Sequence, residues 1–233
     1  MPTQELSLSP ANEIVRLYEQ QSLAEHPLFQ RLRQEPVNLT AIWIFTMNMN
    51  VQGGVSKNFV RWLASLAARI DDNRMRSIVA KQLNEELGEG NFSRIHSVML
   101  QQLVDGLEPW RLENYTEELL APGREFGQRG EKLFFIQDPY EGVGAFIASE
   151  VSALQIDQCL GNEVRRQNAI APEKLTWITM HEELEVDHVS EVFELAHLIP
   201  KSDPKLEAVW RGAQEMRGAI VAFLDGIYSV SFS

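Results

Sequence analysis

The sequence predicts an all-α protein: one compact bundle of about seven helices that spans residues 1–233 as a single domain. Apolar residues recur at three- and four-residue spacing through almost the whole chain, as on the buried faces of helices. Alternating patterns typical of strands are nearly absent. Most expected segments also begin with Asp, Asn, Ser or Pro, the residues preferred at helix N-termini. No internal repeat and no linker-like composition divides the chain.

The first three segments are each marked by a starting residue. Pro10 lies in the first turn of a helix expected over 10–25, where a missing backbone N–H is tolerated. A short second piece follows over 27–33 and also opens with proline. Asn38 is a suitable cap for a third helix, expected over 38–49, which ends before a pair of glycines.

Three further segments lead to the middle of the chain. Ser56 opens one helix, and the acidic pair at 71–72 opens the next. Gly88 and Gly90 perturb that helix, and the helical period resumes over 91–104.

The stretch 105–137 is the least regular part of the sequence. We expect a loop with short helical pieces there, because prolines and glycines interrupt the pattern. These residues are Pro109, Pro122, Gly123, Gly127 and Gly130. Three long periodic segments then follow, approximately over 140–167, 172–198 and 204–230.

Composition limits the function classes. Lys and Arg number 21 against 33 Asp and Glu, a net charge of −12, which argues against nucleic acid as a partner. The densest apolar run, Ala41–Met47, is far shorter than the roughly 20 residues that cross a membrane. Residues 1–10 show no basic and apolar pattern of a secretory signal, so we expect a cytoplasmic protein. A single cysteine, Cys159, excludes an intrachain disulfide and a zinc–cysteine cluster.

The motif HEELEVDH, residues 181–188, places three polar side chains on one helix face. At about 100° per residue, His181, Glu185 and His188 project within a wedge of about 60°. Ile178 and Val192 extend that wedge, so the polar trio interrupts a core-facing stripe. A buried carboxylate costs several kcal/mol unless it is paired or coordinated, and two adjacent imidazoles indicate a divalent metal. The alternative is a pair of core histidines with exposed salt bridges.

Two other segments carry similar residues. Glu150 lies on an apolar face in GVGAFIASEVSALQ, where a hydrogen-bond network would be the structural alternative. Glu89 precedes His96 by seven positions, so on a continuous helix the two differ by only about 20°. Glu86 extends an apolar stripe but lies about 80° from His96, so the helical phase favours Glu89. Glu85 and Glu86 stay open as alternatives.

Together these positions predict a dimetal site. Three carboxylates and three imidazoles from three helices suit two divalent ions in a bundle core. If the histidines are neutral, a ligand charge of about −3 nearly cancels the charge of two ferrous ions, about +4. Oxygen and nitrogen ligands accept manganese as well as iron.

These motifs resemble those of the haem-oxygenase-like diiron oxidases, also called the iron-containing redox enzyme family. The pair Glu89 and His96 is similar to the family's Glu-x6-His, Glu150 to its lone glutamate, and HEELEVDH to its His-x3-Asp/Glu-x2-His. The resemblance implies a haem-oxygenase-like bundle without haem, with two irons as cofactors.

The same resemblance assigns roles and partners. It implies the metal ligands Glu89, His96, Glu150, His181, Glu185 and His188. Glu150 would be the flexible or bridging carboxylate in catalysis. The partners implied are O2 and a small amine, amino acid or fatty-acid-like substrate, oxidised by N-oxygenation, desaturation or carbon–carbon cleavage.

Other function classes stay open. A metal-free member of the same fold could be a cofactorless oxidase or a thiaminase II-like hydrolase, and the latter needs a nucleophilic cysteine. Cys159 lies nine residues after Glu150, about 180° around the helix, which disfavours that role. A non-catalytic protein could bind a basic partner, and the last helix could form a homodimer face. The aromatic residues that could line a pocket are more typical of ordinary core; they are Trp43, Phe45, Phe59, Trp62, Phe146 and Trp177.

Overall fold

The computed structural model describes residues 10–34, 36, 38–113, 115–200 and 203–232, without the side chains of 10, 11 and 182–186. Within these ranges the protein is α-helical and contains no strand, which confirms the predicted fold class. The α-helices are α1 Pro10–Gln20, α2 Pro27–Leu32, α3 Leu39–Asn50, α4 Val55–Arg69, α5 Asn73–Glu86, α6 His96–Gly106, α7 Ala121–Glu131, α8 Pro139–Gln167, α9 Thr176–His197 and α10 Lys205–Phe232. None of the described helices is both long and apolar enough to span a bilayer.

Several helices begin where the sequence places a capping residue. Asn38 Oδ1 accepts a hydrogen bond of 3.0 Å from the backbone N–H of Ala41, at the start of α3. Asp138 caps α8 in the same way, through the backbone N–H of Tyr140 at 2.8 Å. These bonds satisfy N–H groups that have no partner inside the helix, and so they determine where each helix begins.

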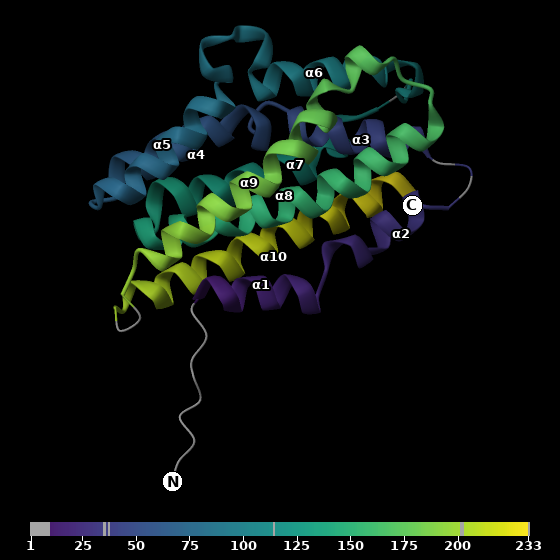
Figure 1. Ribbon diagram of the computed structural model, residues 1–233. Helices are drawn as coiled ribbons and strands as arrows, with labels where there is room; N and C mark the ends of the chain where they lie inside the picture. The colour runs from purple at the N-terminus through teal and green to yellow at the C-terminus, as the bar shows by residue number, and fades with distance from the viewer. Residues whose placement is uncertain (1–9, 35, 37, 114, 201–202, 233) are drawn as a thin grey trace.

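The long helices α8, α9 and α10 form the centre of the bundle, with α10 lying along α8 (Figure 1). A Cβ atom at Gly144 would lie 1.8 Å from the carbonyl oxygen of Val209, and one at Gly212 would lie 1.9 Å from that of Glu141. The two backbones therefore approach more closely than any larger residue allows. The apolar face of α10, including Ile220 and Leu224, is buried in the core of this chain.

Helix α7 corrects the prediction of an irregular stretch over 105–137. It is a regular helix that continues into a π-helical turn, Lys132–Ile136. A Cβ at Gly127 would lie 1.7 Å from the carbonyl oxygen of Gly53, and one at Gly130 would lie 2.2 Å from the Trp62 ring. These glycines allow close helix packing, which outweighs their helix-propensity cost of about 1 kcal/mol each.

The connection between α5 and α6 corrects a second expectation. Helix α5 ends at Glu86, and Gly88, Glu89 and Gly90 all adopt the left-handed backbone conformation, with φ of 75°, 52° and 84°. Helix α6 begins only at His96. Glu89 and His96 therefore do not share a continuous helix, and the phase argument that favoured Glu89 over Glu86 was wrong.

Candidate metal centre

Four helices bring carboxylates and imidazoles together in the interior. Glu85 and Glu86 lie in the last turn of α5, His96 is the first residue of α6, and Glu150 lies midway along α8. Helix α9 contributes His181 and His188, which lie two turns apart on its inner face. Glu150 and all three histidines are buried, with 3–6% of their surface exposed.

The first group of donor atoms belongs to Glu86, His96 and His181. Glu86 Oε1 lies 3.0 Å from His96 Nδ1, and one ligand atom from each residue lies within 4.8 Å of the others. The imidazole rings of His96 and His181 meet edge to face, with their centroids 4.7 Å apart. Three potential ligands from three helices therefore surround one point.

The second group is centred on His188. Its Nε2 lies 3.2 Å from Glu85 Oε2, and its Nδ1 lies 3.2 Å from Glu150 Oε2. The imidazole thus stands between a carboxylate from α5 and one from α8. Because Glu85 and Glu86 are neighbours in one helical turn, the two groups lie next to each other.

These short contacts have the spacing, but not the alignment, of hydrogen bonds. Glu85 Oε2, His96 Nδ1 and both ring nitrogens of His188 are buried and lack a hydrogen-bond partner. Buried polar atoms are rarely left in that state. Two ligands at 2.0–2.2 Å from one metal ion and at right angles to each other lie about 3 Å apart. The donor set and spacing of Glu86, His96 and His181 fit one divalent metal ion. At His188 the two carboxylates face opposite ring nitrogens, so one ion there would be bound by His188 with either Glu85 or Glu150.

The pKa values of Glu86 and Glu150 are shifted in opposite directions. Burial alone would raise the pKa of Glu86, but the charge and close contact of His96, with smaller contributions from the other histidines, hold it below the ordinary value. Burial raises the pKa of Glu150, and its contact with His188 offsets this only in part. The charges of Glu86 and His96 also act on Glu150, so the two groups behave electrostatically as one cluster.

The two histidines of α9 differ in protonation. Burial, together with the charge of nearby His96, lowers the pKa of His181 to about 3, so this ring is neutral at physiological pH. Its Nδ1 donates a hydrogen bond of 2.7 Å to the carbonyl oxygen of Trp177, which leaves Nε2 as the unprotonated nitrogen. Burial lowers the pKa of His188 as well, but contact with Glu150 and the charges of Glu85 and Glu86 raise it to about 9 overall. In the metal-free protein a proton on His188 therefore partly compensates the carboxylates.

The structure brings together four of the six predicted ligands: His96, Glu150, His181 and His188. Glu89 lies outside the group; its side chain is half exposed and its Oε2 lies 3.3 Å from Arg94 Nη1. The side chain of Glu185 lies outside the described residues, although its backbone belongs to α9.

The structure places Glu85 and Glu86 where Glu89 was expected. The apolar stripe of α5 pointed to Glu86, since Val79 on that stripe is fully buried. The hydrogen bond between His181 and the carbonyl oxygen of Trp177 could not be predicted from residue types, because it depends on backbone geometry.

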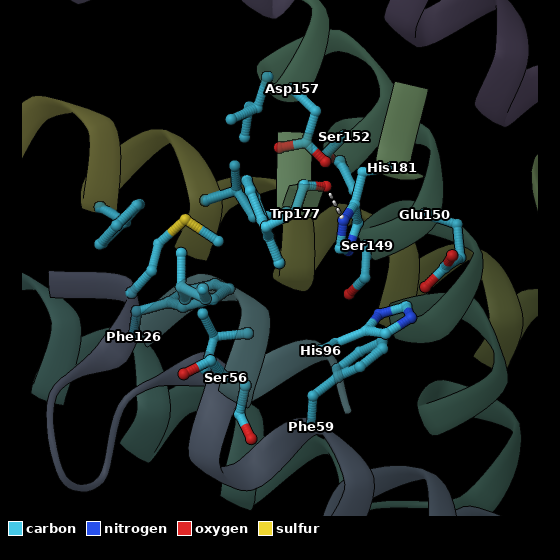
Figure 2. Close-up of a pocket in the computed structure, with 18 of the residues that line it drawn as sticks. Ser56, Phe59, His96, Phe126, Ser149, Glu150, Ser152, Asp157, Trp177 and His181 are labelled. Carbon is cyan, nitrogen blue, oxygen red and sulfur yellow. Dashed lines mark hydrogen bonds between the residues drawn. The ribbon is translucent and has the colours of Figure 1, made fainter. Parts of the chain in front are cut away.

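A cavity of about 120 Å³ opens from this cluster into the bundle. Figure 2 shows His96, Glu150 and His181 on one side of it, with Trp177 and Phe126 farther along the wall. Of the six aromatics suggested as pocket walls, Phe45, Phe59 and Trp177 line the cavity. Trp43, Trp62 and Phe146 are not part of its lining and belong to the core. The cavity suits one small molecule with a mainly apolar body.

Residues 54–219 match the family model of the iron-containing redox enzymes. The chain belongs to that family. The matched region includes every residue of the cluster, from Glu85 to His188. No curated protein matches the chain.

Several solved structures have a similar fold over nearly the whole length of this chain. A CADD-like protein of unknown function from Nostoc punctiforme has a TM-score of 0.74 at 15% identity, covering 96% of this chain and 95% of that one. A domain of unknown function with a haem-oxygenase-like fold from Shewanella denitrificans has a TM-score of 0.71 at 14% identity, covering 94% and 90%. A TenA homologue from Pseudomonas syringae pv. tomato has a TM-score of 0.68 at 13% identity, covering 95% and 93%. These likenesses show a haem-oxygenase-like fold.

Proposed function

We propose that the protein is a non-haem dimetal oxidase, with two irons as the expected metals, that uses O2 to oxidise a small organic substrate. The observation that carries the proposal is the adjacency of two buried donor groups beside one apolar cavity. Glu86, His96 and His181 would hold one ion. The second ion would be held at His188, through Nδ1 together with Glu150 or through Nε2 together with Glu85, and Glu150 also faces the cavity.

Two ferrous ions bound here would supply two electrons for the reduction of dioxygen. The chain's own residues prepare that chemistry. The Trp177 carbonyl holds Nδ1–H of His181, so Nε2 keeps its lone pair for a metal. Glu150, the single cluster residue on α8, lines the cavity and would serve as a carboxylate ligand on its substrate side.

The cavity would hold substrate next to these ligands and restrict water. Most of its wall is apolar, including Phe45, Phe59 and Trp177. Ser149 of α8 adds a hydroxyl group, which donates to the carbonyl oxygen of Ala145 and could accept a hydrogen bond from a polar substituent (Figure 2). An apolar wall with a few polar groups is typical of small-molecule sites. We propose an amine, amino acid or fatty-acid-like compound as substrate.

A thiaminase II-like hydrolase, suggested by the TenA homologue among the similar structures, has weaker support in the residues. Cys159 is the single cysteine of the chain and is not part of the cavity lining. Burial raises the pKa of its thiol, which keeps it protonated rather than nucleophilic.

Anaerobic addition of ferrous iron to the chelated protein tests the proposal. We expect close to two irons per chain, followed by a transient visible absorption when O2 is admitted. His181→Ala and Glu150→Ala should each reduce the bound iron, because each removes a ligand from one donor group. Wild-type iron content in both variants, with circular dichroism unchanged, would overturn the assignment.

A further inference from the structure

The cavity beside the metal centre has a neighbour on its far side. A second pocket, of about 220 Å³, lies between α7 and α10. Phe126 of α7 and Phe223 of α10 belong to the lining of both spaces. One layer of side chains therefore separates the metal-facing cavity from the outer pocket.

That layer consists of two aromatic rings held by apolar contacts. The ring centroids of Phe126 and Phe223 lie 5.4 Å apart with a tilted arrangement. Phe223 also meets the edge of Phe45 at 5.5 Å, and Phe126 meets Trp62 at 6.3 Å. The elements shared by the two linings are these two side chains, so a rotamer change at Phe126 or Phe223 would alter the layer between the spaces. Such changes require much less energy than a movement of helices.

The outer pocket has the composition expected of an entrance. Its α10 wall includes the small residues Ala219 and Ala222, whereas at Gly226 the two helices are in close contact, because a Cβ there would lie 2.8 Å from Pro122. Glu125 and Arg129 of α7 also line it and are solvated. Charged groups at the exposed rim and the buried rings of Phe126 and Phe223 at the base suit a molecule with a polar end and an apolar body.

We propose that Phe126 and Phe223 form a gate between the two spaces, and that they set the length of substrate the protein accepts. A molecule with an extended apolar body would enter between α7 and α10, pass the two rings and reach the metal-facing cavity. This inference rests on the proposed function in taking that cavity as the substrate site. The gate itself depends on the shape of the bundle and not on bound metal.

The test compares a compact and an elongated apolar probe, toluene and 1-octanol, by calorimetry on the full-length chain, as isolated and after chelation. In wild type we expect toluene to bind more tightly than 1-octanol. Phe126→Leu should raise the affinity for 1-octanol about tenfold, because two or more additional methylenes become buried. Phe126→Trp should slow the association of both probes in stopped-flow measurements.

Phe134→Leu is the matched control, since Phe134 is fully buried and lines neither space. It should leave the affinity for 1-octanol unchanged. An equal gain in Phe126→Leu and Phe134→Leu, or no gain in a folded Phe126→Leu, would overturn the gate. Because chelated protein gives the same result, failure of iron loading would remove the oxidase assignment without affecting this one.

Discussion

Nδ1 of His96 lies 3.0 Å from Oε1 of Glu86, although a helix end, a turn and a helix start separate the two residues. The contact exists because α5 ends at Glu86 and the left-handed residues at 88–90 turn the chain back so that α6 begins at His96. A Cβ at Gly88 would lie 2.8 Å from the backbone nitrogen of Ile95, so only glycine permits this return. The turn thus brings an acid and an imidazole from consecutive helices to one point.

Glu86 and Glu89 give a matched pair for metal binding. Glu86→Gln should lower the affinity for ferrous iron about tenfold or more, because it removes a charged ligand from the buried group. Glu89→Gln should bind iron as wild type does, since this side chain is half exposed and contacts Arg94. Iron titration monitored by a competing chelator measures both. A larger loss in Glu89→Gln than in Glu86→Gln would contradict the structure-based choice.

Bound metal should stabilise the fold. The ligands come from four helices, so the site exists only in the native state and binding adds to the free energy of unfolding. At a ferrous ion concentration of about 100 times the dissociation constant, we expect a gain of about 2.7 kcal/mol. Thermal unfolding under anaerobic conditions, with and without iron, measures the shift. His181→Ala should show a smaller shift, because it removes a ligand from one of the two donor groups, and a wild-type shift in that variant would argue for binding elsewhere.

Gly127 tests the packing of α7. A Cβ there would lie 1.7 Å from the carbonyl oxygen of Gly53, so Gly127→Ala should lower the free energy of unfolding by about 3 kcal/mol. Gly218 of α10 is the control, because it is exposed and a Cβ would meet nothing within 4 Å. Gly218→Ala should stabilise the protein by up to about 1 kcal/mol. Urea unfolding compares the two, and similar effects in both would be inconsistent with the close helix contact.

The burial of Tyr18 predicts that the protein loses stability at alkaline pH. Its hydroxyl donates to the carbonyl oxygen of Ala148 at 3.1 Å and lies 2.8 Å from Ser152 Oγ. Burial raises its pKa from 10.0 to about 12, against smaller opposing effects of Ser152 and Arg217. In the unfolded chain the tyrosine loses its proton at a lower pH than Tyr18 does in the folded protein. The contribution of Tyr18 to the free energy of unfolding is therefore fully present below pH 10 and falls by about 2–3 kcal/mol as the pH rises to 12.

Tyr18→Phe isolates that effect from the titration of lysines. The variant should be about 1 kcal/mol less stable at neutral pH, because a buried hydrogen bond is lost. Between pH 10 and 12 its stability should decline less steeply than that of wild type. Denaturant unfolding at several pH values checks both statements. Parallel curves for the two proteins would mean that Tyr18 ionises without a penalty.

The helices and most of the cluster follow from local sequence. Helical periodicity repeats within a few residues, so the buried faces of α8 and α9 could be identified without knowing their neighbours. This is why Glu150, His181 and His188 were assigned to core-facing positions, and all three are buried. The capping role of Asn38 is local in the same sense.

The choice among Glu85, Glu86 and Glu89 depended on tertiary structure. The direction of one side chain can be predicted from that of an earlier one only while the helix between them is continuous. The left-handed turn at 88–90 interrupts the helix between Glu86 and His96. Helix α7 was missed for a related reason: its glycines weaken the isolated helix, and only contact with Asn48, Gly53 and Trp62 shows why they are needed. The cavity and its two phenylalanines depend likewise on how separate helices pack. Short-range periodicity determines which face of a helix is apolar, whereas packing between helices determines which side chains meet there.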